Sequence, residues 1–117
     1  MSDDNEGIRA WAKGDLAAEA VAEIIIGTHL AEYVIPAYLD WDESHQFARP
    51  NLHELVQDID TGKHHSSSSA DFLARLCLSL MSSEASVSMG RLWSLDRGNR
   101  QVVVSALASA LGVEALS

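Results

Sequence analysis

Apolar residues recur along much of the chain at intervals of three and four, which is the spacing of one face of an α-helix. Between Asp15 and Gly27 the apolar stripe consists of Ala17, Ala20, Val21, Ile24 and Ile25. Asp15 has the side chain of an N-terminal cap, and Gly27 is a typical helix stop. The pattern predicts a helix between these two residues, preceded by a short helical turn between Gly7 and Gly14.

The segment 28–60 is punctuated by capping residues and prolines. Thr28 is placed to cap a short helix through Tyr33 or Val34, and Pro36 disfavours helical geometry at the residue before it. The stretch 38–50 has no clean period, so we expect it to be irregular or a short helix. Asn51 is placed to cap the next helix. The inward residues expected of that helix are Leu52, Leu55, Val56 and Ile59.

Two further helices are predicted after the polar connection 63–69. Ser68 and Asp71 fit the capping-box pattern of a helix start. The buried face expected after them consists of Phe72, Leu73, Leu76, Cys77 and Leu80. Ser88 is placed to cap a short turn through Trp93, and Asp96 to cap a final long helix that Gly112 closes.

The final helix is apolar on most of its circumference. Its main stripe consists of Val103, Ala106, Leu107, Ala110 and Leu111, while Val102, Val104 and Ala108 lie outside the centre of that stripe. A helix that is apolar nearly all round is buried on several sides. We therefore expect the helix from Arg97 to Leu111 to be either the centre of the bundle or shared with a second subunit.

These elements define an all-α fold class. No segment alternates with period two for more than a few residues, and the chain has no Asn-Gly or Asp-Gly hairpin turn. Its 117 residues suit one domain. We predict a compact single-domain bundle of five or six helices with a buried C-terminal helix. Residues 1–6 are expected to be a loose acidic N-terminus, and residues 112–117 a frayed C-terminus.

Charge is distributed unevenly along the chain, whose net charge is −9. Residues 1–60 contain thirteen acidic and three basic side chains, whereas residues 61–117 contain four acidic and five basic ones. The acidic half is either a solvated surface or a surface that attracts a basic partner. No apolar run is long enough to span a membrane, and the N-terminus is acidic where a signal peptide is basic. We expect a cytoplasmic protein.

Candidate catalytic and metal-binding residues lack the spacing of known sites. Asp40, Asp42, His45 and His53 are the best candidates for a metal-dependent enzyme, but they have neither the calcium-loop nor the zinc-motif pattern. Cys77 falls among leucines, where desolvation disfavours the reactive thiolate. The sequence therefore predicts no catalytic residue, no metal and no cofactor.

A helix-turn-helix is the main alternative interpretation. A short helix before Ser94 and a long helix that carries Arg97, Asn99, Arg100 and Gln101 at its start would suit base edges in DNA. The apolar character of that helix and the acidic net charge oppose this interpretation. We expect Arg97 and Arg100 to pair with the acidic half instead, and Asn99 to bond nearby backbone groups.

Four stretches carry a resemblance: IRAWAKG, AAEAVAEIIIGTHLA, LVQDIDTGKHHSSSSADFLARLCLSL and LWSLDRGNRQVVVSALASALG. They resemble a set of uncharacterised small helical actinobacterial proteins, some of them associated with mobile elements. Leu95, Asp96 and Asn99 match the opening of a final alanine-rich helix in that set, whereas the serine-rich link at 63–71 departs from it. The resemblance implies a source and no assigned activity.

The sequence thus favours a non-catalytic module that interacts with another protein or self-associates as a homodimer, with no membrane or nucleic-acid partner. The residues available for such contacts are Arg97, Asn99, Arg100, Gln101, Val104 and Ala108. The alternative function is a DNA-linked transcriptional regulator that uses the helix-turn-helix-like C-terminal segment.

Overall fold

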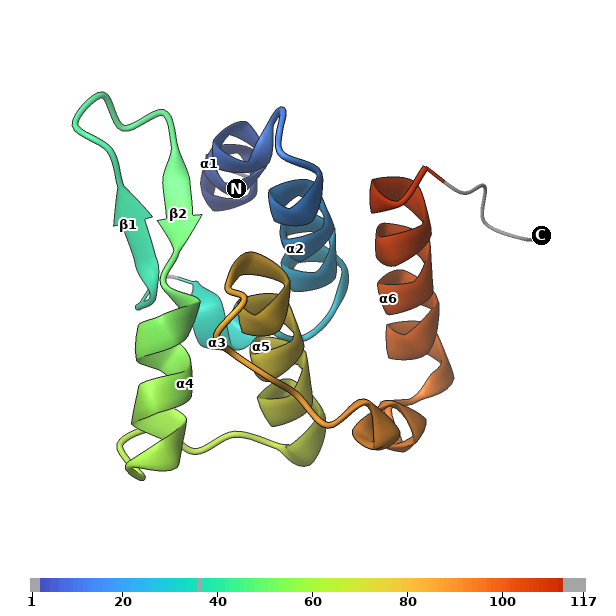
Figure 1. Ribbon diagram of the computed structural model, residues 1–117. Helices are drawn as coiled ribbons and strands as arrows, with labels where there is room; N and C mark the ends of the chain where they lie inside the picture. Colours follow the sequence, from blue (N-terminus) through green and yellow to red (C-terminus); the bar gives the residue numbers. More distant parts are fainter. Residues whose placement is uncertain (1–2, 36, 113–117) are drawn as a thin grey trace.

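The computed structural model describes residues 3–35 and 37–112. Its helices are α1 (Asp3–Ala12), α2 (Leu16–Gly27), α3 (Ala31–Val34), α4 (Leu52–Asp60), α5 (Ser68–Met81), the 3-10 helix η1 (Met89–Ser94) and α6 (Arg97–Ala110). A two-stranded sheet of β1 (Leu39–Trp41) and β2 (Ala48–Pro50) completes the described fold (Figure 1). The predicted all-α class is confirmed, with a single compact domain that is largely helical.

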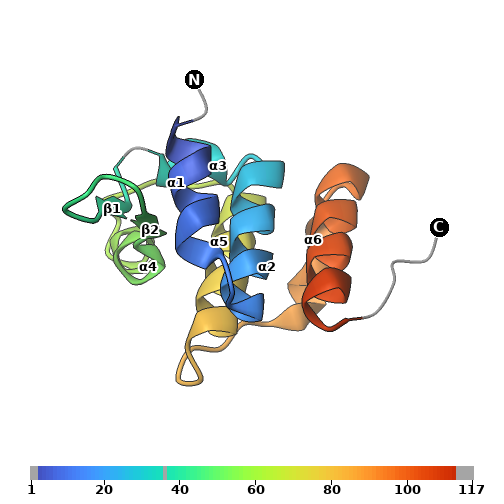
Figure 2. The same ribbon diagram turned by 90° about the horizontal axis from the view of Figure 1, so that it is seen from above.

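Helix α2 lies at the centre of the molecule. It packs against α1, α3, α5 and α6, and Figure 2 shows it between α1 and α6 with α5 beneath it. Its buried residues are Ala18, Ala20, Val21, Ala22, Ile24 and Ile25. The predicted stripe therefore faces the core in large part, and the small alanines let neighbouring helices approach closely.

Helix α6 lies at one edge of the molecule rather than at its centre, with the sheet and α4 at the opposite edge (Figure 1, Figure 2). Of its fourteen residues, only Val103 and Ala106 are buried. The expectation that α6 is buried on several sides is therefore wrong for the described chain. The reason is geometric, because α6 packs mainly on the single helix α2 and one neighbour covers one face.

The segment expected to be irregular or helical forms a β-hairpin. Strands β1 and β2 are antiparallel, with Leu39 opposite Pro50 and Trp41 opposite Ala48. Asp42 organises the turn, since one carboxylate oxygen accepts the backbone N–H groups of Gln46 and Phe47, each at 2.8 Å. With strands of only three residues, the alternation is too short to stand out in the sequence.

The hairpin packs against α1 through the ring of Trp41. A Cβ atom placed on Gly7 would lie 2.5 Å from the Trp41 ring and 2.9 Å from the Cβ of Ala48. Gly7 therefore permits a close approach that any larger residue would obstruct. Helix α1 is also longer than predicted, because it begins at Asp3. Residues 3–6 are thus helical rather than loose, and residues 1–2 lie outside the described range.

Of the six capping predictions, three are confirmed, two are displaced, and the sixth is met in position only, because Ser88 precedes η1 without a capping hydrogen bond from its side chain. The side chains of Asp15, Asn51 and Asp96 each accept a backbone N–H three residues on. Helix α5 is capped by Ser67 rather than Ser68, since the Ser67 hydroxyl accepts the N–H of Ala70. Asp71 binds Arg75 and Arg91 instead of closing a capping box. Thr28 is buried and receives the N–H of Leu30, but it does not cap α3 itself.

Gly112 closes α6 as predicted, because it follows the helix in a left-handed turn conformation. Residues 113–117, the rest of the expected frayed end, lie outside the described range. Within the described part of the chain, the helices are too short or too polar to cross a lipid bilayer.

Candidate interaction surface

The start of α6 brings together the residues that a helix-turn-helix would use. Asp96 caps the helix, because its carboxylate accepts the backbone N–H of Asn99 at 2.8 Å. The short helix η1 precedes it, as predicted for the stretch before Ser94. Asp96 thereby fixes which side chains of the first turn face inward and which face solvent.

The partly buried side chain of Asn99 forms a hydrogen bond within the protein. Its amide nitrogen lies 3.3 Å from Nδ1 of His29, and Nε2 of the same ring lies 3.2 Å from the hydroxyl of Ser69. His29 therefore connects the start of α6 to the start of α5. The expectation that Asn99 bonds nearby backbone groups through its side chain is wrong, since the amide binds a histidine seventy residues away in the sequence.

Arg100 is likewise held within the chain. Its Nε donates to the carbonyl of Leu95 at 2.7 Å, and a terminal nitrogen donates to the carbonyl of Trp93 at 3.2 Å. These carbonyls end η1, so the guanidinium satisfies acceptors that the short helix leaves free. Arg100 therefore binds backbone carbonyls, and the expectation that it pairs with the acidic half of the chain is wrong.

Of the remaining predicted residues, Arg97, Val104 and Ala108 share the side of α6 that faces away from α2, and Gln101 lies at its edge, where it also borders the groove between α1, α2 and α6. Arg97, Gln101, Val104 and Ala108, together with Leu111 just beyond the helix, form what we call the outer face of α6. Val104 is 56% exposed and Leu111 is 77% exposed, whereas Ala108 is half-buried. Trp93, in the helix η1 that precedes α6, is 74% exposed. The outer face thus presents large apolar side chains to solvent.

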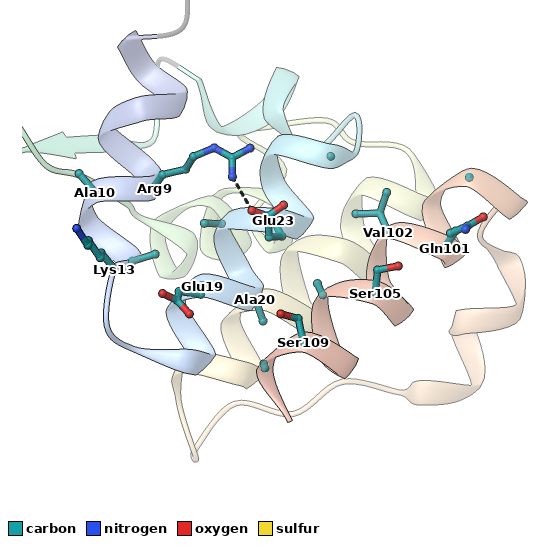
Figure 3. A pocket seen from close by; sticks show the side chains of 16 residues that line it. Arg9, Ala10, Lys13, Glu19, Ala20, Glu23, Gln101, Val102, Ser105 and Ser109 are labelled. Atoms are coloured by element: carbon teal, nitrogen blue, oxygen red, sulfur yellow. Dashed lines mark hydrogen bonds and ion pairs between the residues drawn. The ribbon is translucent and has the colours of Figure 1, made fainter. Parts of the chain in front are cut away.

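A groove of about 890 Å³ runs beside α6, between α1, α2 and α6. Figure 3 shows its α6 wall, which carries Gln101, Ser105 and Ser109, and an ion pair on its opposite rim. In that pair Nη1 of Arg9 lies 2.5 Å from Oε1 of Glu23. A Cβ on Gly27 would lie 2.8 Å from Val102, so α2 and α6 are in close contact at one end of the groove. Small residues thus let α2 and α6 pack closely and leave a shallow space along one side of α6.

Three of the four residues considered for metal or catalytic chemistry have structural roles. Asp40 pairs with Arg49 across the hairpin at 3.1 Å, and the ring of His45 stacks on Trp41 with centroids 4.2 Å apart. Hydrogen bonds from Ser44 and from backbone N–H groups lower the pKa of Asp42 to about 2. His53 is exposed on α4. Across residues 3–35 and 37–112, no three potential ligands converge as a metal ion would require.

Burial also makes the thiol of Cys77 unreactive. The thiol is fully buried in α5, and desolvation raises its pKa far above the usual range. Since the thiolate is the nucleophile, this cysteine is unreactive in the folded protein. Its inclusion in the predicted buried face is confirmed.

Several residues of this region were not identified from the sequence. Trp93 and Leu111 were assigned to a turn and to the buried stripe, and His29 carried no recognised pattern. A spacing of four, three, four and three along 97, 101, 104, 108 and 111 is the signal that identifies the outer face. Comparison with known protein families, curated proteins and solved structures finds no match. The actinobacterial resemblance therefore stays a prediction.

Proposed function

We propose that the protein is a non-catalytic interaction module that self-associates as a homodimer through the outer face of α6. The observation that carries this proposal is the exposure of Val104 and Leu111 on the side of α6 that α2 does not cover. Alternation of four- and three-residue spacings is the pattern by which one helix packs against another. Large exposed apolar side chains gathered on one face are typical of an interaction site.

Two arguments favour a protein partner over DNA. Asn99 is bound to His29, and Arg100 to the backbone at the end of η1. Of the polar side chains in the first turns of α6, Arg97 and Gln101 make no hydrogen bond or ion pair with other residues in 3–35 and 37–112. A net charge of −9 opposes approach to a phosphate backbone. Gene regulation through this segment is therefore the weaker proposal.

Binding is also favoured over catalysis. The charged rim of the groove is neutralised internally by the pair of Arg9 and Glu23, and Glu19 accepts the backbone N–H of Gly14. Cys77 is buried and its pKa is raised, while Asp42 holds a turn. We include in the proposal a cytoplasmic location, which fits a single thiol kept reduced inside the core.

Size-exclusion chromatography coupled to light scattering, which gives the molar mass in solution, tests the proposal. We expect wild-type protein to be dimeric at micromolar concentration, as an interface of about 1,600 Å² permits. Val104→Asp places a charge on the outer face, and the variant is expected to be monomeric. Phe47→Asp is the matched control, because Phe47 is 44% exposed on the hairpin turn, far from α6, and this variant should stay dimeric. A wild-type protein that stays monomeric at high concentration contradicts the proposal.

A further inference from the structure

A second pocket lies at the opposite edge of the molecule from α6, between α1 and the β-hairpin (Figure 2). We call it the hairpin pocket. Its volume of about 670 Å³ falls within the range of about 300–1,000 Å³ that is typical of ligand sites. Its lining includes Asp4, Glu6 and Gly7 of α1 and Trp41, His45 and Gln46 of the hairpin.

Two aromatic rings form one wall of the hairpin pocket. The ring of His45 stacks on that of Trp41, with the centroids 4.2 Å apart and the planes 9° apart. Trp41 is half-buried and His45 is exposed, so the stack is open to solvent on the His45 side. Arginine side chains stack on aromatic rings, and tryptophan attracts cations most strongly. The wall therefore suits a planar cation.

The hairpin turn holds this aromatic wall in place. The carboxylate of Asp42 accepts the backbone N–H groups of Gln46 and Phe47, each at 2.8 Å, and its carbonyl accepts the N–H of His45 at 3.0 Å. His45 has a φ of 60°, in the left-handed region that few residues other than glycine adopt. A ligand thus meets a wall that is already formed, which lowers the entropic cost of binding.

The charged groups that line the hairpin pocket are acidic. Asp4 and Glu6 contribute carboxylates, and none of the described residues in the lining is a lysine or an arginine. Arg9 of α1 and Arg49 of β2 are each paired with a carboxylate outside the pocket. Residues 1–60, which form both walls, contain thirteen acidic and only three basic side chains. The charge of this region therefore complements a basic partner.

We propose that the hairpin pocket binds an arginine side chain from a basic segment of a partner protein. The guanidinium stacks on the ring of His45, and its N–H groups donate to the carboxylates of Asp4 and Glu6. Arginine is favoured over lysine, because a planar and weakly hydrated guanidinium both stacks on rings and donates several hydrogen bonds at once. This inference is independent of self-association, since the hairpin and α6 lie at opposite edges of the molecule (Figure 1).

Isothermal titration calorimetry with end-blocked peptides of six arginines or six lysines tests the proposal. The two peptides carry the same charge, so a difference in affinity reports the stacking of the guanidinium. We expect the arginine peptide to bind the wild-type protein about tenfold more tightly than the lysine peptide. Trp41→Leu removes the stack but no charge, and it should abolish most of that difference. Equal affinity of the two peptides for the wild-type protein overturns the proposal.

Paired variants separate the hairpin pocket from general attraction to an acidic protein. Gln46→Arg places a cation in the pocket and should weaken binding of the arginine peptide about tenfold. Ser83→Arg adds the same charge in the exposed connection after α5 and should weaken binding no more than about twofold. Asp4→Asn should likewise weaken binding more than Glu84→Gln, which removes the same charge outside the pocket. Equal losses within each pair overturn the proposed site.

Nuclear magnetic resonance locates the bound peptide. The indole N–H signal of Trp41 should shift when the arginine peptide is added, whereas that of Trp93 should not. A shift at Trp93 alone overturns the proposed site. Thermal melting checks that each variant is folded; Gln46→Arg keeps the turn, because Gln46 binds Asp42 through its backbone N–H, and it decides the test if Trp41→Leu unfolds. A monomeric wild-type protein that binds the peptide at Trp41 overturns self-association and leaves this inference standing.

Discussion

Replacing Gly7 by alanine tests how the hairpin packs on the helical bundle. Gly7 lies within α1, so alanine on its own would favour the helix by about 1 kcal/mol. The added Cβ would lie 2.5 and 2.7 Å from two atoms of the Trp41 ring and 2.9 Å from Ala48. Overpacking of this kind costs about 1–3 kcal/mol, and contacts from two elements leave little room to relax. We expect a net destabilisation of up to about 2 kcal/mol.

Urea unfolding followed by circular dichroism measures the change in the free energy of unfolding. Gly98→Ala is the matched control, because Gly98 is also helical and its added Cβ would meet nothing closer than 3.6 Å. That variant should be equally stable or more stable by up to about 1 kcal/mol. Replacing Trp41 by leucine in the Gly7→Ala background should recover part of the loss, as coupled neighbours do. A Gly7→Ala protein that gains as much stability as the Gly98→Ala control would refute the close packing of Trp41 on α1.

Three further predictions follow from single side chains. Hydrogen bonds lower the pKa of Asp42 to about 2, so its stabilising effect is complete above about pH 4 and is lost as pH falls towards 2; Asp42→Asn should remove this part of the acid dependence of the melting temperature. Burial, together with the hydrogen bond to Asp58, raises the pKa of Tyr38 to about 12. Stability should therefore fall as pH rises from about 10 to 12, and Tyr38→Phe should remove that fall while costing about 1 kcal/mol at neutral pH. Cys77 should react with a thiol reagent only after unfolding in urea, and rapid reaction of the native protein would contradict its burial.

Local features of the fold were predictable because their causes are local. An N-terminal cap needs only one suitable side chain three residues before a free N–H, so Asp15, Asn51 and Asp96 were identified from the sequence. In the run of serines that precedes α5, several residues satisfy the same rule. The sequence therefore placed the cap at Ser68, one residue after Ser67.

The arrangement of elements in space was less predictable. The hairpin depends on the turn around Asp42 and on the ring of Trp41 over Gly7, and neither contact leaves a periodic pattern. The apolar circumference of α6 did not reveal which side a neighbour would cover. Only the packing of α2 against Val103 and Ala106 separates the covered face from the exposed one at Val104.

The central claim is that the exposed outer face of α6 is covered by a second copy of the chain. The most direct test is the molar mass of the wild-type protein in solution, measured by light scattering across a range of concentrations. The account predicts a mass that rises to twice 12.7 kDa and stays there. A molar mass equal to that of one chain at every concentration would contradict the claim, because Val104 would then stay exposed to solvent.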